Sequence, residues 1–350
     1  MLIRPVAPRD LDALYQIAQE SGPGFTSLMP DRDALARKID HSVSSFARTV
    51  DRPGDEHYLF VLEDCDTGDI LGTTGIEASA GSQHPLIHLH RQELSDSAGI
   101  RRVGRTPELL TRCQHYRGCT EICSLYLRPA FRRANAGKLL SRVRFVFMAL
   151  HPERFSELVI AEMRGVWDPA GQSPFWNWLQ SEARASKTGV DHEPLSTERM
   201  TDAARGALGE VHIDTRPARA MLEKEGFRHA GYVDPIDGGP TLECRREAIA
   251  SVRNTRTGNV VILSNADESD GHRAASQGDA IITNTGVADF RATVTRQLHA
   301  DAGRLAVPAN LARALGLSAN GRACYLPLTS RQWPAVGQAQ ISSEEVRYAY

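Results

Sequence analysis

The loop between a predicted strand and a predicted helix carries residues suited to bind a phosphate group. Residues 121–127 are β-rich, and residues 136–150 are strongly helical. Because the first turn of a helix has unpaired N–H groups and the positive end of the helix dipole, a diphosphate could bind where this helix starts. Plain capping of the helix is the alternative. The candidate residues, which combine small size with positive charge, are Arg132, Arg133, Asn135, Ala136, Gly137 and Lys138.

A second group of residues has the atom types of a metal site without its spacing. Cys113, His115, Cys119 and Cys123 lie close together in the sequence, but they contain no Cys-x-x-Cys pair, and Cys123 falls in a predicted strand. The six cysteines also lack the dense, regular spacing of a secreted disulfide framework. The sequence therefore predicts no metal site, no disulfide and a reducing compartment.

The composition is that of an ordinary soluble globular protein of two or three domains. The chain has 350 residues, of which 41% are hydrophobic and 24% are charged, and its formal net charge is -2. No stretch reaches the about 18 apolar residues of a membrane span, and the first residues lack the apolar core of a signal peptide. The numerous arginines are scattered along the chain. We therefore expect a cytoplasmic protein that binds small molecules, without nucleic acid or membrane partners.

The phosphate loop must be positioned by the strands and helices around it, and a β-rich region follows these elements in the chain. The helix after the loop leads to a strand over 158–163, and this strand-helix-strand order implies two parallel strands. Residues 78–117 have weak periodicity and predict an insertion of loops with one or two short strands. From about residue 253 onward, alternating apolar runs and one short helix predict a small β-rich domain. The other predicted elements are a strand over 3–6, helices from residue 8 and over 31–46, a hairpin of 58–63 and 70–77, a helix over 173–179, a loop-rich stretch over 181–205, a helix over 216–225 and a β region over 227–244.

This order of elements resembles the GNAT acyltransferase fold, whose pyrophosphate loop has the pattern Arg/Gln-x-x-Gly-x-Gly/Ala. Arg132 and Gly137 fit the pattern, and Asn135 stands in place of the first glycine. Asn tolerates the left-handed backbone conformation better than other residues with a side chain. The resemblance implies an α+β fold, with a GNAT-type mixed β-sheet flanked by helices over 1–250 and a small β-rich C-terminal domain over 251–350.

Several longer motifs are similar to those of the arginine N-succinyltransferases of bacterial arginine catabolism. They extend over most of the chain up to about Cys244, and the residues after it resemble that family only loosely. The motifs are Ile3–Val6, Gly24–Leu28, Phe60–Asp64, Glu121–Leu125, Ala161–Val166, Ser173–Trp176 and Asp237–Cys244.

This resemblance implies transfer of a succinyl group from succinyl-CoA, a co-substrate, to the α-amino group of arginine, with no permanently bound cofactor. The amine attacks the thioester directly in a ternary complex; since it is mostly protonated at neutral pH, a general base must take its proton. Glu121 and Glu162 are the candidate bases, because both lie on strands that splay apart in the GNAT fold. A surface or salt-bridged glutamate is the alternative for each. Leu125 and Leu127 are candidate contacts of the acyl-CoA, and a backbone amide near Leu125 or Tyr126 could hold the oxyanion.

The acceptor amino acid needs carboxylates for its guanidinium and a cation or a helix terminus for its α-carboxylate. Thr26, Ser27, Arg164 and His192 are the candidate contacts of this substrate. Helix capping is the alternative for Thr26 and Ser27. The histidines within 78–117 are interpreted as ordinary loop residues.

The chain departs from the family pattern by a shorter segment around 180–210. Family members carry a Pro-Lys-His-Pro-Ile-Tyr stretch there, whereas this chain has only the polar residues 181–205. If the missing residues help to close the acceptor pocket, arginine should bind weakly. The alternatives are therefore a non-catalytic acyl-CoA-binding or partner subunit, and transfer to another amine. A homo- or hetero-oligomer is compatible with each of these functions. Leu222 also stands where many GNAT enzymes have a tyrosine that protonates the departing thiolate.

Overall fold

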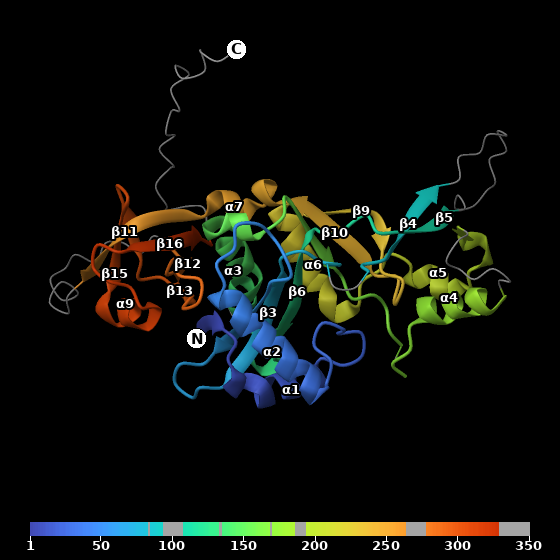
Figure 1. The fold of residues 1–350 in the computed structure, drawn as a ribbon, viewed down its shortest axis with the longest axis horizontal. Coiled ribbons are helices and arrows are strands. Elements are labelled where there is room, and N and C mark those ends of the chain that lie inside the picture. The colour runs from blue at the N-terminus through green and yellow to red at the C-terminus, as the bar shows by residue number, and fades with distance from the viewer. Residues whose placement is uncertain are drawn as a thin grey trace, which may run out of the picture.

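The fold is built on one mixed β-sheet that extends across the whole molecule (Figure 1). The computed structural model describes residues 1–82, 85–93, 108–132, 135–168, 170–185, 194–263 and 278–328. Within these ranges the strand order is β14-β15-β11-β16-β12-β13-β1-β2-β3-β6-β7-β10-β9-β4-β5-β8. The strands are β1 (Leu2–Pro5), β2 (His57–Glu63), β3 (Ile70–Glu77), β4 (His88–Glu93), β5 (Glu108–Cys113), β6 (Thr120–Leu127), β7 (Leu158–Glu162), β8 (Leu195–Ser196), β9 (Arg228–Val233), β10 (Pro240–Arg245), β11 (Arg256–Leu263), β12 (Ala280–Thr283), β13 (Ala292–Thr295), β14 (His299–Asp301), β15 (Arg304–Pro308) and β16 (Arg322–Pro327).

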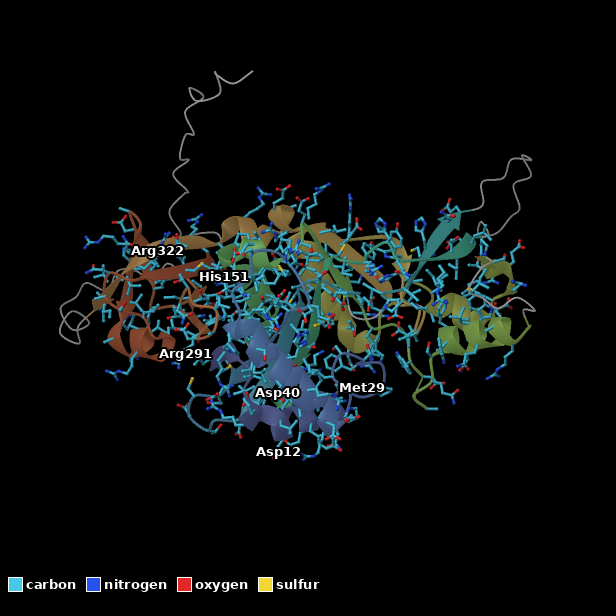
Figure 2. All side chains as sticks on the ribbon, in the orientation of Figure 1. Asp12, Met29, Asp40, His151, Arg291 and Arg322 are labelled. Carbon is cyan, nitrogen blue, oxygen red and sulfur yellow. The ribbon has the colours of Figure 1, made fainter. Side chains whose placement is uncertain are left out.

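The helices lie against this sheet and follow the predicted local signals. Helix α2 starts after Asp31, whose side chain accepts a hydrogen bond from the N–H of Ala34 at 2.9 Å. Helix α6 ends at Gly226, which has a φ of 104° that favours glycine. Asp12 on α1 and Asp40 on α2 are exposed on the outer faces of these helices (Figure 2). The helices are α1 (Leu11–Glu20), α2 (Arg32–Ala47), α3 (Ala136–Leu150), α4 (Pro174–Ala185), α5 (Asp202–Ala207), α6 (Arg216–Glu225), α7 (Ala250–Asn254) and α9 (Ala309–Leu315).

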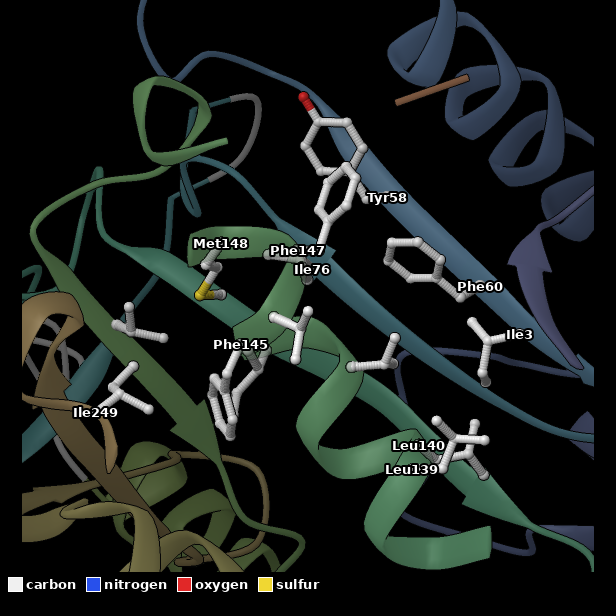
Figure 3. Packing of buried hydrophobic residues seen from close by; sticks show 14 of the residues in the cluster. Ile3, Tyr58, Phe60, Ile76, Leu139, Leu140, Phe145, Phe147, Met148 and Ile249 are labelled. Atoms are coloured by element: carbon white, nitrogen blue, oxygen red, sulfur yellow. The ribbon is translucent and has the colours of Figure 1, made fainter. Parts of the chain in front are cut away.

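Strand β2 is buried on both faces. It lies between two parts of the hydrophobic core. Tyr58 and Phe60 belong to the part that packs with α3, and the Tyr58 ring lies 5.3 Å from that of Phe147 (Figure 3). Leu59 and Val61 point to the opposite face, because successive side chains of a strand alternate, and they pack with residues of α1 and α2. The central strands are therefore held between helices on both sides.

The predicted α+β, GNAT-type architecture is confirmed in the order of its elements. The hairpin of β2 and β3 is antiparallel, and β6 and β7 are joined by α3 and run parallel, as the strand-helix-strand order implied. The C-terminal end of α6 leads into β9, which pairs with β10. Among the described residues, no helix is both long and apolar enough to cross a membrane.

One end of the sheet comes from the C-terminal region, and the strands of the predicted insertion lie toward the other end (Figure 1), where β8 forms the edge. Strands β4 and β5 pair with each other, and β4 also pairs with β9, so the described part of 78–117 extends the sheet by a hairpin. On the side of the C-terminal region, β13 pairs with β1 through Ala292 and Ile3. The C-terminal strands have a hydrophobic cluster of their own and also share the main core. The boundary at residue 250 stays a prediction.

Candidate active site

The parallel strands β6 and β7 separate soon after they begin. They pair at only two positions, the second of which joins Glu121 to Ile160, although β6 continues to Leu127. A β-bulge in β6 accompanies the separation, since its register with β3 shifts and Ser124 has a φ of 52°. Beyond Glu121, the backbone of β6 on the side of β7 pairs with no strand in the described part of the chain. This is the splay that the resemblance to the GNAT fold predicted, and it exposes backbone groups to a ligand.

A cavity of ≈ 750 Å³ lies at this separation, a size typical of small-molecule sites. Its wall comes from β6, β7, the first turn of α3, helix α6 and the loop before α2. Ala136 does not line it, because that side chain is fully buried in the core. Arg133 and His192 lie outside the described residues. The predicted site residues that do line the cavity are Thr26, Ser27, Glu121, Leu125, Leu127, Arg132, Asn135, Gly137, Lys138, Glu162 and Arg164.

The start of α3 has the features of an anion site. Asn135 adopts the predicted left-handed conformation, with a φ of 68°. Among the described residues no side chain caps the helix, and its first turn contains no acidic residue, so its first N–H groups are available to a ligand. A Cβ placed on Gly137 would lie 4.0 Å from Leu127 Cδ2, its nearest described neighbour. The backbone at Gly137 therefore borders open space, into which a diphosphate could come close.

The C-terminal region also contacts this anion site, which sequence reasoning missed. The side-chain amide of Asn135 donates a hydrogen bond to Asp279 Oδ2 at 3.0 Å, and Asp279 also accepts one from Arg296. These two hydrogen bonds lower the pKa of Asp279, so it stays ionised at neutral pH. Asp279, which directly precedes β12, thus fixes the side chain of Asn135 although it is far away in the sequence, and no local pattern signals such a contact.

Glu121 is a half-buried carboxylate at the point where the strands separate. It lines the cavity, and its carboxylate has no hydrogen-bond or ion-pair partner in the part of the chain that the structure describes. Burial raises its pKa well above the ordinary glutamate value, and the carboxylates of Glu162 and Glu77 raise that pKa further. A carboxylate with a raised pKa is suited to accept a proton near neutral pH.

Comparison with known proteins places this geometry in a family. A sequence model described as the arginine N-succinyltransferase beta subunit matches residues 1–186 and 190–251. The chain belongs to the arginine N-succinyltransferase family. It is 36% identical over 314 residues to the arginine N-succinyltransferase of Citrobacter koseri, covering 85% of this chain and 89% of that protein. The enzyme of that name from an Enterobacter species is 38% identical over 273 residues, covering 73% of this chain and 79% of the relative.

A solved structure of the same family has the same fold. It is subunit AI of the arginine/ornithine succinyltransferase of Pseudomonas aeruginosa, which is 31% identical and superposes with a TM-score of 0.83. The match covers 94% of this chain and 99% of that subunit. The family resemblance and the fold predicted from the sequence are therefore confirmed, and the protein is an acyltransferase.

In this arginine N-succinyltransferase family member, the loop before α2 lines the cavity. Asp31 caps α2, so helix capping does not explain Thr26 and Ser27, which line the cavity instead. The Lys38 ammonium donates to the carbonyl of Ser27 at 2.9 Å and holds the loop. Arg164 lines the same cavity and donates to a single carbonyl, that of Ser21, at 3.3 Å.

Interpreting His88 as an ordinary loop histidine was wrong. It lies on β4 and is fully buried, and its Nε2 atom is 2.8 Å from Oε1 of Glu162. Its ring lies edge-on to that of Tyr116, with 5.1 Å between the centroids. The sequence could not indicate this contact, because it depends on the insertion folding back along β9.

Residues 186–193 lie outside the described residues, so the effect of the shorter segment stays a prediction.

Two aspartates from the turn between β9 and β10 complete the acidic end of the cavity. Asp237 is buried, and its carboxylate accepts hydrogen bonds from the N–H groups of Gly165 and Gly239 and from the indole of Trp167. Asp234 lines the cavity, and burial raises its pKa well above the ordinary value, as does the charge of Glu162. Sequence reasoning did not name them as site residues, although Asp237 begins one of the family motifs.

Among the described residues, Cys123 does not group with Cys113, His115 and Cys119 as metal ligands would. Its Sγ atom groups with ligand atoms of His57 and Glu77, all within 4.8 Å of one another. Burial raises the pKa of Cys123 to about 12, and the positive charge of Lys38 acts on both Cys123 and His57. A protonated thiol and a nearby ammonium do not favour a cation. The absence of a metal site stays a prediction.

Proposed function

We propose that this protein transfers the succinyl group of succinyl-CoA to the α-amino group of L-arginine. The observation that carries the proposal is the cavity between β6 and β7, which brings an uncapped helix start and the unpartnered carboxylate of Glu121 to one space. The first can bind the phosphates of an acyl-CoA and the second can accept a proton from an amine. The family relationship supports both the donor and the acceptor.

The acyl-CoA would bind with its pyrophosphate at the first turn of α3. The N–H groups there, Arg132 and Lys138 supply hydrogen bonds and positive charge, and each charge-assisted hydrogen bond contributes roughly 1.5–3 kcal/mol. The pantetheine arm would then lie in the opening between β6 and β7, beside Leu125 and Leu127. The thioester would then lie close to Glu121, where the strands separate.

Glu121 would act as the general base. It takes a proton from the α-ammonium of the acceptor, and the free amine then attacks the thioester carbonyl carbon. An N–C bond forms and the C–S bond breaks, with the oxyanion held by a backbone N–H of β6 near Leu125. The CoA leaves as a thiolate. Because Leu222 occupies the position of the tyrosine acid, the thiolate takes its proton from water or from the attacking nitrogen.

Arg164 would bind the α-carboxylate of the acceptor. Its guanidinium lines the cavity, and Nε is buried without a hydrogen-bond partner among the described residues. An arginine side chain stays charged at neutral pH and forms paired hydrogen bonds with carboxylates. Such a contact would orient the α-amino group toward Glu121, because the amine and the carboxylate share one carbon.

The test is release of free thiol from succinyl-CoA in the presence of single amino acids, with mass analysis of the product. Arginine should support thiol release and gain one succinyl group on its α-nitrogen. Acetyl-CoA serves as the comparison for the acyl group. Binding of CoA without thiol release for any amine would contradict the proposal and favour a non-catalytic subunit. Faster transfer to another amine would show that arginine is not the acceptor.

A further inference from the structure

We propose that Glu162 and Asp234 form the subsite that binds the cationic end of the acceptor side chain, and that His88 positions Glu162 within it. This inference rests on the proposed function and identifies how the same cavity would select its amino acid. It assigns Glu162 to substrate binding, so that Glu121 remains the only general base.

The fold brings these three residues together from three separate segments. Strand β4 pairs with β9 through Leu89 and Val233, which places His88 beside the position of Asp234. The last residue of β7, Glu162, lies opposite Thr241 on β10, next to the same turn. Both carboxylates line the cavity. Glu162 and Asp234 therefore form one end of the cavity. Glu121 lies between that end and β3.

Each of these two carboxylates keeps an oxygen for a ligand. Asp234 accepts one hydrogen bond, to Oδ1 from the N–H of Ile236 at 2.6 Å. Glu162 has Oε1 beside His88, and neither Oε2 of Glu162 nor Oδ2 of Asp234 has a partner among the described residues. Asp237 differs, because both of its oxygens accept hydrogen bonds from protein groups. Asp237 thus holds the turn, whereas Asp234 and Glu162 can bind a substrate.

The charge balance of the cavity favours a cation at this place. Glu121, Glu162 and Asp234 face one cavity, and no lysine or arginine in the described ranges forms an ion pair with any of them. Lys38 and Arg164 line or border the site but donate to backbone carbonyls. Lys38 attracts Glu121 but forms an ion pair with none of the three, and carboxylates grouped in a half-buried cavity repel one another. A guanidinium offers donors in a fork that matches two carboxylates, so it would relieve this repulsion.

His88 is suited to hold Glu162 in place. It is fully buried, its Nε2 atom lies 2.8 Å from Glu162 Oε1, and its ring is fixed against Tyr116. The hydroxyl of Tyr116 in turn donates to Glu243 at 2.7 Å. His88 does not line the cavity, so we assign it a positioning role.

The experiment compares arginine with citrulline, whose neutral ureido group has nearly the shape of a guanidinium. The full-length protein and its Asp234→Asn variant are assayed by thiol release from succinyl-CoA. Asp301→Asn, an exposed site on β14, is the matched control. Asp234→Asn should lower kcat/KM for arginine roughly 10–100-fold, mainly through KM, and leave that for citrulline within about threefold. Equal losses for both acceptors, or a wild-type protein that uses both equally well, would overturn the inference.

His88 is tested by its own pair of variants. His88→Ala should raise KM for arginine but not for citrulline, whereas His88→Gln should keep arginine use, because its amide can donate to Glu162. If both variants lose the two acceptors alike, His88 does not act through this subsite.

Calorimetric binding of arginine and citrulline to the CoA-bound protein separates the two proposals. Tighter binding of arginine, lost in Asp234→Asn, supports the subsite even if no succinyl group is transferred. Absence of thiol release with arginine would then contradict the proposed function alone. Equal binding of the two ligands would contradict the subsite whether or not the protein is active.

Discussion

Replacing Glu121 by glutamine tests the centre of the proposed mechanism. The substitution keeps the size of the side chain and removes its ability to accept a proton. A positioned general base contributes roughly 10²–10⁴-fold in rate, which corresponds to about 3–5 kcal/mol of transition-state stabilisation. We therefore expect the rate of succinyl transfer to fall by roughly that factor. The affinity for CoA should stay unchanged, because the pyrophosphate site lies at the start of α3.

The pH profile gives this prediction a second measurement. Burial and the charges of Glu162 and Glu77 raise the pKa of Glu121. The rate should therefore fall with decreasing pH already above the ordinary glutamate value of about 4.3, as Glu121 becomes protonated. Glu121→Gln should lack this acid limb. Thiol release at saturating succinyl-CoA measures the rate, and calorimetry measures CoA binding. A near-normal rate of Glu121→Gln between about pH 6 and about pH 9 would remove Glu121 from the mechanism.

Glu77→Gln is the matched control. Glu77 faces Glu121 across β3 and β6 but does not line the cavity. Its negative charge raises the pKa of Glu121, so its removal should shift the acid limb to lower pH and leave the maximal rate near normal. An unshifted limb in Glu77→Gln would show that the limb belongs to another group.

The same raised pKa sets the sign of a stability effect. The folded protein holds the proton of Glu121 more tightly than the unfolded chain does, so this residue lowers stability as pH rises from about 4.3 through its folded pKa. Glu121→Gln should therefore be more stable than the wild type above that range and equal to it below. Urea unfolding at several pH values measures the difference, and a less stable variant at high pH would contradict this reasoning.

Three further predictions concern binding. Gly137→Glu should abolish CoA binding, because its side chain adds bulk and negative charge at the pyrophosphate site. Gly137→Ala should fold normally, since a Cβ at this position has room. Unchanged calorimetric affinity for CoA in a folded Gly137→Glu protein would refute the site. Asn135→Gly should keep the affinity for CoA. Asn135→Val should lower this affinity and destabilise the loop, because a β-branched residue does not tolerate a φ of 68°. Equal affinities of the two variants would count against a role of the left-handed conformation in CoA binding. Arg164→Ala should raise KM for arginine but not for agmatine, which lacks the α-carboxylate, and a parallel rise for both would exclude the proposed contact.

The sequence alone determined the fold class and the family, and it predicts the position of the anion loop. These follow from local patterns: the hydrophobic periods of α2 and α3, the helix stop at Gly226, and the run from Arg132 to Gly137. The left-handed conformation of Asn135 is also a local property, because only a few residue types adopt it readily. Such features involve neighbours in the chain, and the sequence specifies neighbours directly.

Only the tertiary structure decided which distant groups share the cavity. The sequence predicts a loop around His88, yet the pairing of β4 with β9 buries this residue beside Glu162. The contact between Asn135 and Asp279 likewise joins residues far apart in the chain. The raised pKa of Glu121 depends on its burial and on charges from other strands. These contacts and pKa shifts arise from sheet register and from the exclusion of water. Both depend on how separate segments of the chain pack, so a local sequence pattern does not specify them.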